Sequence, residues 1–524
     1  MPGFDKTGLI IIQRGIGQKD EKYTCKDQKK IKDEPEKPHS GRLEQLNVHN
    51  YPQNRLLAKR KKCINWNLHK SNPMIRQKLT LYLILLISSS VIAQEKEGTT
   101  DQREENVKTG FSLGGVPVVA YDSDIGFKYG ALVNLYWYGD GSRYPMYDHS
   151  VYVEWSRTTK GNGINQITYD SDRLIPGIRS FFEASYLTEK ALDFYGFNGY
   201  KAVYSPEYEA SENEQGLANR LYYRHARQLL RLKADFQGQI LGKKLRWLAG
   251  VAYYGNNIDS VDVESLNEGK EEDLLSRNSL YGNYVEYGLI PADQAEGGGH
   301  TLLKGGLVYD TRDNEPNPFK GIWTEMQLHY APSFLSTTDY SYTRLVLTHR
   351  QYFTLIPQWM NLAYRLSYQG KLTGEMPFYM LPYLYNTAPK LTTDGVGGSK
   401  TVRGVLRNRI VGEGFAYGNL ELRGKILRTT VLNQNLYIAL SAFLDAGMVT
   451  QKYEMDTSGL PDDLPGNLPE QIIDQDAKEV PHLGFGGGIH FALNQNFIVT
   501  VDYGFAAREE DGDTGLYINL NFLF

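Results

Sequence analysis

Residues 434–447 read QNLYIALSAFLDAG, and apolar and polar side chains alternate along most of this stretch. Leu436, Leu440 and Leu444 fall on one side of an extended chain, whereas Ser441 and Asp445 fall on the other. A period of two predicts a β-strand with one apolar face and one polar face. Because a buried carboxylate needs polar partners, the second face is expected to line a polar interior.

The same alternation recurs along the chain in both directions. From Phe111 to Phe524 the sequence divides into about sixteen strand-like segments bounded by Gly, Pro, Asn and Asp, and the last is expected at 514–524. The chain has 38 Tyr and 20 Phe, as expected for aromatic girdles at membrane interfaces, and lacks an apolar run long enough for a spanning helix. We therefore predict an all-β fold, a transmembrane antiparallel β-barrel of about 16 strands. A soluble two-sheet sandwich is the alternative with the same alternation.

The spacing of the predicted strands gives the barrel a direction. Outer-membrane barrels have short periplasmic turns and longer outer loops. Here every long gap follows an odd-numbered strand, which predicts long outer loops at 189–221, 258–300, 371–411 and 448–480. Both ends of the barrel domain, residues 111–524, are then expected on the periplasmic side.

The segment before the barrel has the features of an export signal. Arg76 and Lys78 precede the apolar run 79–87, and Ala93 ends a small-residue cleavage site before Gln94. We expect a signal peptide at 74–93 and a short periplasmic tail at 94–110. Residues 1–73 would then be a mis-assigned N-terminal extension without a fold of its own. A short buried strand or helix is the alternative for the apolar run.

Charge and cysteine content exclude several kinds of function. Cys25 and Cys63 both lie before the signal, so no disulfide or thiolate site is expected in the exported chain. Residues 1–93 are basic, so the exported part is more acidic than the whole chain, whose formal net charge is −4. An acidic surface argues against nucleic-acid partners. The exported part contains no sequence motif for a catalytic nucleophile or a metal site, and we expect no enzyme activity, cofactor or metal.

Four short motifs, taken in order and with their spacing, match those of one family. They are residues 309–314 with Pro318 and Gly321, residues 401–404 with 418–423 downstream, residues 443–447, and a terminal strand that ends in Phe524. On these motifs the chain resembles the BamA/TamA superfamily (bacterial surface antigen family) over roughly residues 300–524. The motif residues are Asp310, Arg312, Asp313, Gly321, Asn419, Glu421, Phe443 and Gly447.

The resemblance implies a specific contact inside the barrel. In this family the tip formed here by Val402, Arg403 and Gly404 belongs to the sixth outer loop, which folds back into the lumen. The tip arginine pairs with an inward acidic residue on strand 13, which corresponds to Asp445. Such a pair is physically reasonable because a guanidinium group in a confined lumen needs a carboxylate. An ordinary solvated loop arginine is the alternative.

The resemblance also concerns the two ends of the chain. The terminal aromatic residues, here Phe522 and Phe524, form the signal that the barrel-assembly machinery reads in this family. Well-characterised members carry periplasmic POTRA domains before the barrel, and residues 94–110 leave no room for one. We therefore expect a barrel-only member of the family.

The predicted function follows from the resemblance. We expect a barrel in the Gram-negative outer membrane, in contact with lipid and lipopolysaccharide, that aids insertion or translocation of protein or lipid cargo. The alternative is a barrel without transport activity that serves as a surface binding or adhesion protein or as a passive channel. A third reading, a hydrolase, would depend on histidines such as His300, His329, His349 and His490.

Overall fold

The computed structural model describes residues 107, 109–122, 126–144, 146–209, 220–242, 244–271, 274–315, 317–387, 395–431, 434–461, 472–493, 497–520, 522 and 524. The predicted extension, the predicted signal peptide and most of the predicted tail lie outside these residues, so they stay predictions. The described residues begin where the barrel was expected, with the first strand at Phe111.

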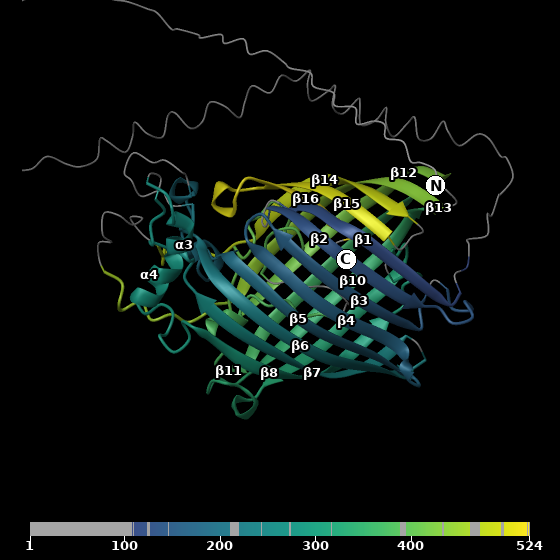
Figure 1. Ribbon diagram of the computed structural model, residues 1–524, viewed down its shortest axis with the longest axis horizontal. Coiled ribbons are helices and arrows are strands. Elements are labelled where there is room, and N and C mark those ends of the chain that lie inside the picture. Colours follow the sequence, from purple (N-terminus) through teal and green to yellow (C-terminus); the bar gives the residue numbers. More distant parts are fainter. Residues whose placement is uncertain are drawn as a thin grey trace, which may run out of the picture. The chain divides into compact units, whose positions relative to one another are not determined.

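Sixteen antiparallel strands follow one another around a closed barrel, each paired with its neighbours in the sequence (Figure 1). They are β1 (Phe111–Asp122), β2 (Gly126–Trp137), β3 (His149–Thr158), β4 (Asn162–Ile175), β5 (Ile178–Asp193), β6 (Arg224–Leu241), β7 (Leu245–Asp259), β8 (Gly297–Asp310), β9 (Gly321–Ala331), β10 (Tyr342–Ile356), β11 (Met360–Gly374), β12 (Gly414–Val431), β13 (Gln434–Gln451), β14 (His482–Leu493), β15 (Phe497–Ala506) and β16 (Thr514–Leu520). The predicted fold class and strand number are confirmed.

The alternation along β13 has the predicted consequence for burial. Leu440 and Leu444 are 45% and 50% exposed on the outside of the barrel, whereas Phe443 and Asp445 are buried inside it. Polar residues inside the barrel make hydrogen bonds to one another, while the outward apolar residues meet lipid.

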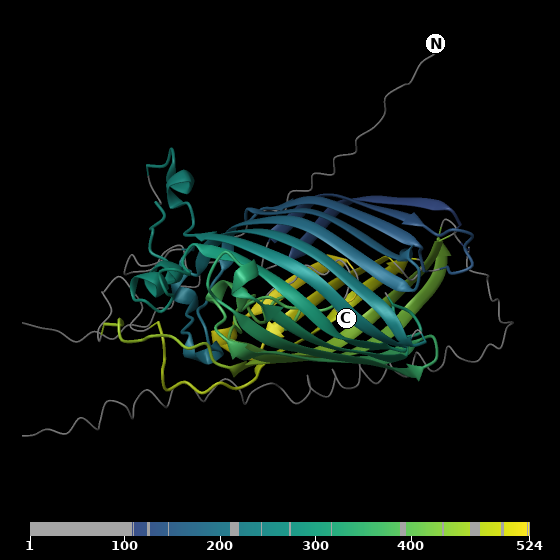
Figure 2. The same cartoon turned by 90° about the horizontal axis from the view of Figure 1, so that it is seen from below.

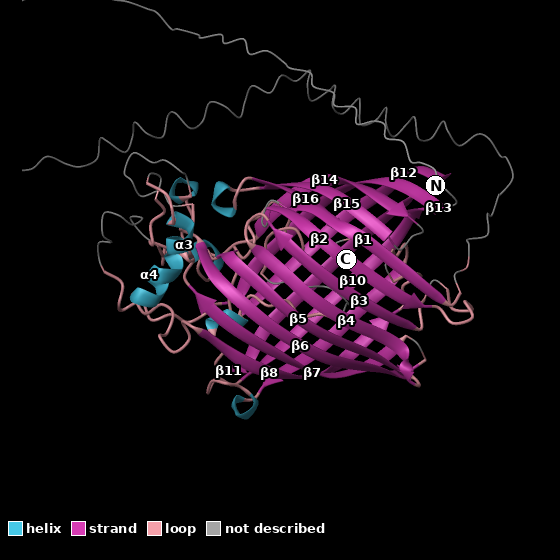
Figure 3. Ribbon diagram, in the orientation of Figure 1, coloured by secondary structure: helices cyan, strands magenta, loops and turns pink. Residues whose placement is uncertain are grey.

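The two ends of the barrel differ in their connections. The long connections are residues 194–223, 260–296, 375–413 and 452–481, and all lie at one end, called the outer end here. Figure 2 shows described parts of these connections beyond the ends of the strands, and Figure 3 shows helices α3 (Val263–Asn267) and α4 (Leu280–Glu286) there. The opposite, inner end has tight turns such as 176–177 and 357–359.

Aromatic side chains from these long connections close the outer end. Phe197 contacts the rings of Tyr284, Phe378 and Tyr453, which belong to three other connections, at centroid distances of 5.7, 6.1 and 4.8 Å. Asn198 and the backbone of Tyr453 exchange two hydrogen bonds, at 2.9 and 2.7 Å. The connections therefore pack on one another as a common core, called the outer cap, instead of extending separately into solvent.

The seam where the barrel closes is its least extensively paired junction. One register pair, Asp122 with Tyr517, joins β1 to β16 among the described residues, whereas seven pairs join β15 to β16. The prediction that the last strand reaches Phe524 is wrong, because β16 ends at Leu520. Beyond the end of the strand, the rings of Phe522 and Phe524 lie inside the barrel, 4.1 and 5.2 Å from the guanidinium carbon of Arg423, and cation–π attraction favours this position.

Candidate functional site: the sixth loop in the lumen

The connection between β11 and β12, residues 375–413, is the sixth outer loop and turns back into the barrel. Val402 and Arg403 at its tip are 0% and 1% exposed. The backbone around the tip is held from several strands: Arg365 donates to the Lys400 carbonyl at 3.0 Å, Asn419 donates to the Thr401 carbonyl at 2.5 Å, and Gly404 N–H donates to the Tyr517 hydroxyl at 3.1 Å. Hydrogen bonds to the barrel wall therefore hold the loop tip in place.

Arg403 is bound by Asp445 in a bidentate arrangement. Its Nε and Nη2 donate to the two carboxylate oxygens at 2.8 and 3.1 Å, and its backbone N–H donates to Asp445 Oδ2 at 3.1 Å. The guanidinium carbon lies 3.4 Å from the centre of the Phe443 ring. The structure thus brings together the two residues that the sequence paired, and both side chains are almost fully buried.

Two further carboxylates complete the surroundings of Arg403. Its Nη1 lies 2.9 Å from Glu421 Oε2 on β12 and 3.4 Å from Asp502 Oδ2 on β15. Burial alone would lower the pKa of the Arg403 guanidinium, but Asp445 and Glu421 raise it above its ordinary value. The side chain therefore stays charged at any physiological pH.

The carboxylates around Arg403 have further partners. Arg423 Nε donates to Glu421 Oε1 at 2.7 Å, and His490 Nε2 lies 3.1 Å from Asp502 Oδ1. Arg423 also donates to the Phe524 carbonyl at 3.3 Å. One chain of charged contacts thus runs from the loop tip to the terminal residues of the chain.

Glycines in the wall allow the loop to lie directly on the strands. A Cβ atom at Gly484 would lie 2.0 Å from the Arg403 carbonyl oxygen, and one at Gly504 would lie 2.8 Å from the Arg403 carbonyl carbon. Gly404 has φ of +95°, and a Cβ there would lie 2.4 Å from the Phe505 backbone. Any side chain at these three positions would push the loop away from the wall.

The predicted motif residues divide between two places. Asn419, Glu421, Phe443 and Gly447 surround the loop tip, where a Cβ at Gly447 would lie 3.1 Å from Val402. Asp310, Arg312, Asp313 and Gly321 lie instead at the inner end, where Arg312 donates to Asp310 at 3.0 and 2.9 Å. The Asp313 carboxylate there accepts from the backbone N–H of Phe319 at 2.9 Å. The first group therefore belongs to the loop site, and the second group belongs to the inner end of the barrel.

Sequence reasoning missed Asp502, Tyr517 and Arg423 as parts of this site. A signal was present for Asp502, since it alternates with Thr500 and Gly504 along a strand and so had to face inward. No pattern along the chain shows that β15 lies close enough to the loop tip for contact.

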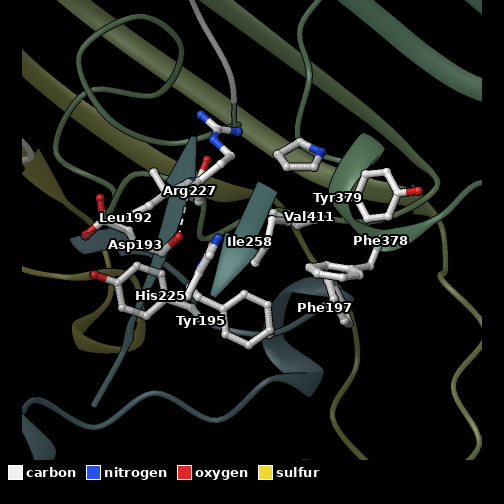
Figure 4. A pocket seen from close by; sticks show the side chains of 14 residues that line it. Leu192, Asp193, Tyr195, Phe197, His225, Arg227, Ile258, Phe378, Tyr379 and Val411 are labelled. Atoms are coloured by element: carbon white, nitrogen blue, oxygen red, sulfur yellow. Dashed lines mark hydrogen bonds between the residues drawn. The ribbon is translucent and has the colours of Figure 1, made fainter. Parts of the chain in front are cut away.

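The outer cap above the loop leaves little empty space. Figure 4 shows a small cavity with Phe197, Phe378 and Tyr379 on one side and His225 and Arg227 on the other. Its volume is about 30 Å³, which is room for a water molecule and far below the several hundred Å³ of a typical small-molecule site. This cavity is a packing defect of the cap.

The described part of the chain offers no candidate metal site and no candidate membrane-spanning helix. Among those residues, no three or more His, Cys, Asp or Glu side chains are arranged to hold a metal ion. No described helix has both the length and the apolar character that a membrane-spanning helix requires.

Comparison with known proteins identifies the family. Residues 222–524 match the Omp85 superfamily domain. Among solved structures, BamA from Haemophilus ducreyi lacking POTRA domains 1–3 is 15% identical with a TM-score of 0.46, over 79% of this chain and 71% of that one. CdiB from Escherichia coli is 9% identical with a TM-score of 0.48, over 79% of this chain and 62% of that one.

Other comparisons are less informative. OprD from Pseudomonas aeruginosa is 9% identical with a TM-score of 0.32, over 80% of this chain and 96% of that one. No curated protein sequence matches. At these identities and scores the likenesses to single structures carry no functional information. The domain match, however, covers more than half of the chain and includes the whole loop site. The chain therefore belongs to the Omp85 superfamily, whose barrels lie in the Gram-negative outer membrane and are not enzymes.

Proposed function

We propose that the barrel aids the insertion or translocation of protein at the outer membrane, and that its seam is where cargo strands engage. The observation that carries the proposal is the short β1–β16 junction: among the residues that the structure describes, one register pair joins these strands, against twelve between β1 and β2. A strand edge with few partners exposes backbone N–H and C=O groups, and such an edge accepts an added strand. Lipid is the second cargo class.

The loop site supports the proposal because it holds the strands next to the seam. Gly404 donates to Tyr517 on β16, and Arg403 contacts Asp502 on the adjacent β15. The docked loop therefore stabilises the β15–β16 side of the seam from within the lumen. Bracing of the strands next to the seam favours opening at a defined place.

Photo-crosslinking tests where cargo engages. A crosslinking amino acid is placed at Tyr121 on β1 or Ile518 on β16, beside the seam, and at the lipid-exposed Leu328 on β9 as the matched control. We expect outer-membrane proteins to be captured from the first two positions and not from Leu328. Equal capture from all three, or none from a correctly folded barrel, contradicts the proposal.

A phenotype separates this proposal from surface binding. Depletion of the protein is expected to lower the amount of other heat-modifiable barrels in the outer membrane. If that amount and the lipid content stay constant while binding of a surface ligand disappears, the chain is a binding or adhesion barrel instead.

A further inference from the structure

The connection between β8 and β9 is longer than a turn requires. Its described residues, 311–315 and 317–320, are called the inner segment here. At the same end of the barrel, two residues join β4 to β5 and three join β10 to β11. The extra length is not used to reach into the periplasm, because the inner segment makes contacts inside the barrel mouth.

One side of the inner segment is held by strands before it in the sequence. Glu315 forms an ion pair with Arg179 on β5 at 3.2 Å, and Arg179 in turn binds Asp170 on β4 at 2.6 Å. The partial burial of Glu315 would by itself raise the pKa of its carboxyl group, but Arg179 and Arg312 lower it to about 2. The Glu315 carboxylate is therefore charged in the folded protein near neutral pH.

The other side of the inner segment is held by strands after it. Asn317 donates to the Tyr437 hydroxyl on β13 at 2.8 Å, and Asn361 on β11 donates to the Pro318 carbonyl at 3.2 Å. Lys425 on β12 lies 4.8 Å from the centre of the Phe319 ring.

These contacts place the inner segment across the lumen. In a sixteen-strand barrel, β5 and β13 are eight strands apart, which is half of the circumference. Glu315 and Asn317 are two positions apart in the sequence and contact these opposite walls. A segment that hugged one wall could not make both contacts.

The base of the inner segment is stiff. Trp323 at the start of β9 lies between the guanidinium groups of Arg312, at 5.3 Å, and Arg350, at 4.0 Å. Gly321 has φ of +108°, and a Cβ there would lie 2.4 Å from the Thr311 carbonyl oxygen, so the chain returns sharply into β9. The base aims the segment at the lumen, whereas an ion pair, hydrogen bonds and the Lys425–Phe319 contact hold its described tip residues.

We propose that the inner segment is a removable closure of the inner mouth of the barrel. Its tip is held by an ion pair whose side chains are 42% (Glu315) and 20% (Arg179) exposed. The hydrogen bond from Asn317 to Tyr437 on the opposite wall is buried but also polar. Water or an incoming chain can replace contacts of this kind, which apolar interlocking would resist. The closure does not depend on which cargo the barrel serves.

Labelling of a lumen cysteine tests the closure. Ser441→Cys, on β13, is introduced into the full chain with Cys25 and Cys63 changed to serine, and the purified barrel in detergent is treated with a sulfonated maleimide. Ser441 faces the lumen midway between Tyr437, which the inner segment contacts, and Asp445, which the loop tip contacts. We expect slow labelling that becomes about ten-fold or more faster in Glu315→Ala/Asn317→Ala.

Two further variants make the result decisive. Arg179→Ala/Tyr437→Phe removes the same two contacts by changing the wall residues and leaves the inner segment itself unchanged. It should therefore speed labelling equally. If Glu315→Ala/Asn317→Ala does not fold, this variant alone tests the proposal. Lys320→Ala changes an exposed residue of the same segment and should leave the rate unchanged. Fast labelling before any contact is removed, or equal rates in all folded variants, overturns the proposal.

Discussion

The two ends of the lumen are closed in physically different ways. At the outer end, rings from four connections pack as one buried core, and Phe197 alone touches three of the other connections. At the inner end, a short segment reaches opposite walls through an ion pair and a few hydrogen bonds. Apolar packing loses free energy when any part separates, whereas the polar groups of the inner contacts can form hydrogen bonds to water instead. The outer closure should therefore be permanent and the inner one reversible.

The largest expected effect comes from the loop tip, which anchors the outer closure to the wall. Arg403→Ala leaves Asp445, Glu421 and Asp502 without their shared cation, and losing one partner of a buried ion pair costs about 3–5 kcal/mol. We expect a lower free energy of unfolding in urea and faster proteolysis of the sixth loop. Arg428→Ala, at an exposed position of β12, is the control and should change stability by less than about 0.5 kcal/mol.

Coupling between Arg403 and Asp445 sharpens this prediction. Asp445→Ala should cost less than Arg403→Ala, because Arg403 keeps Glu421 and Asp502 as partners. The double variant should be little worse than Arg403→Ala, since both changes remove the same contact. Strictly additive losses in the free energy of unfolding would show that the two residues act independently.

Packing in the outer cap should give the next largest effect. Phe197→Ala removes a ring that is 2% exposed, and truncation of a buried phenylalanine typically costs about 3–5 kcal/mol, with the lower value expected for a cap that can relax. Phe334 is also in an outer connection but is 78% exposed, so Phe334→Ala should have almost no effect. Protease cleavage rates of the outer connections measure both. Similar rates in the two variants would mean that the cap is not a packed core.

A smaller effect on stability is expected at the inner end. Glu315→Gln removes one partly exposed ion pair, which is worth about 0–1 kcal/mol. The free energy of unfolding should therefore fall far less than for Arg403→Ala. A loss as large as that at the loop tip would show that the inner segment is a structural support and not a removable closure.

The smallest effect is the pH dependence of that ion pair. The pKa of Glu315 is lowered from 4.5 to about 2. Its contribution to stability is therefore fully present above about pH 4.5 and is lost as pH falls toward 2. The difference in unfolding free energy between the natural chain and Glu315→Gln should stay constant from pH 7 to pH 5 and shrink below that. A difference that grows on acidification would contradict the assignment.

Much of the fold followed from the sequence because the period of two determines which face each residue occupies. Parity, the odd or even position of a residue along its strand, was enough to put Asp445 and Glu421 inside the barrel. The family resemblance supplied Arg403 as a partner for Asp445. Parity does not say which residues of distant strands meet across a lumen, so Asp502 and the inner segment were not foreseen. It also fails where a strand stops: Phe522 and Phe524 were assigned to the last strand, but both follow its end, and their rings lie on Arg423 inside the barrel.

The three carboxylates around Arg403 have a consequence for the order of folding. Glu421, Asp445 and Asp502 all follow the loop in the sequence, on β12, β13 and β15. The receptor for the loop tip therefore does not exist until the final third of the chain has paired, however early the loop itself emerges. The contact with Asp502, 99 positions along the chain, forms last of the three, because the intervening chain must first be ordered. Docking of Arg403 should thus be among the last steps of maturation, and burial of its side chain would report that the barrel is complete.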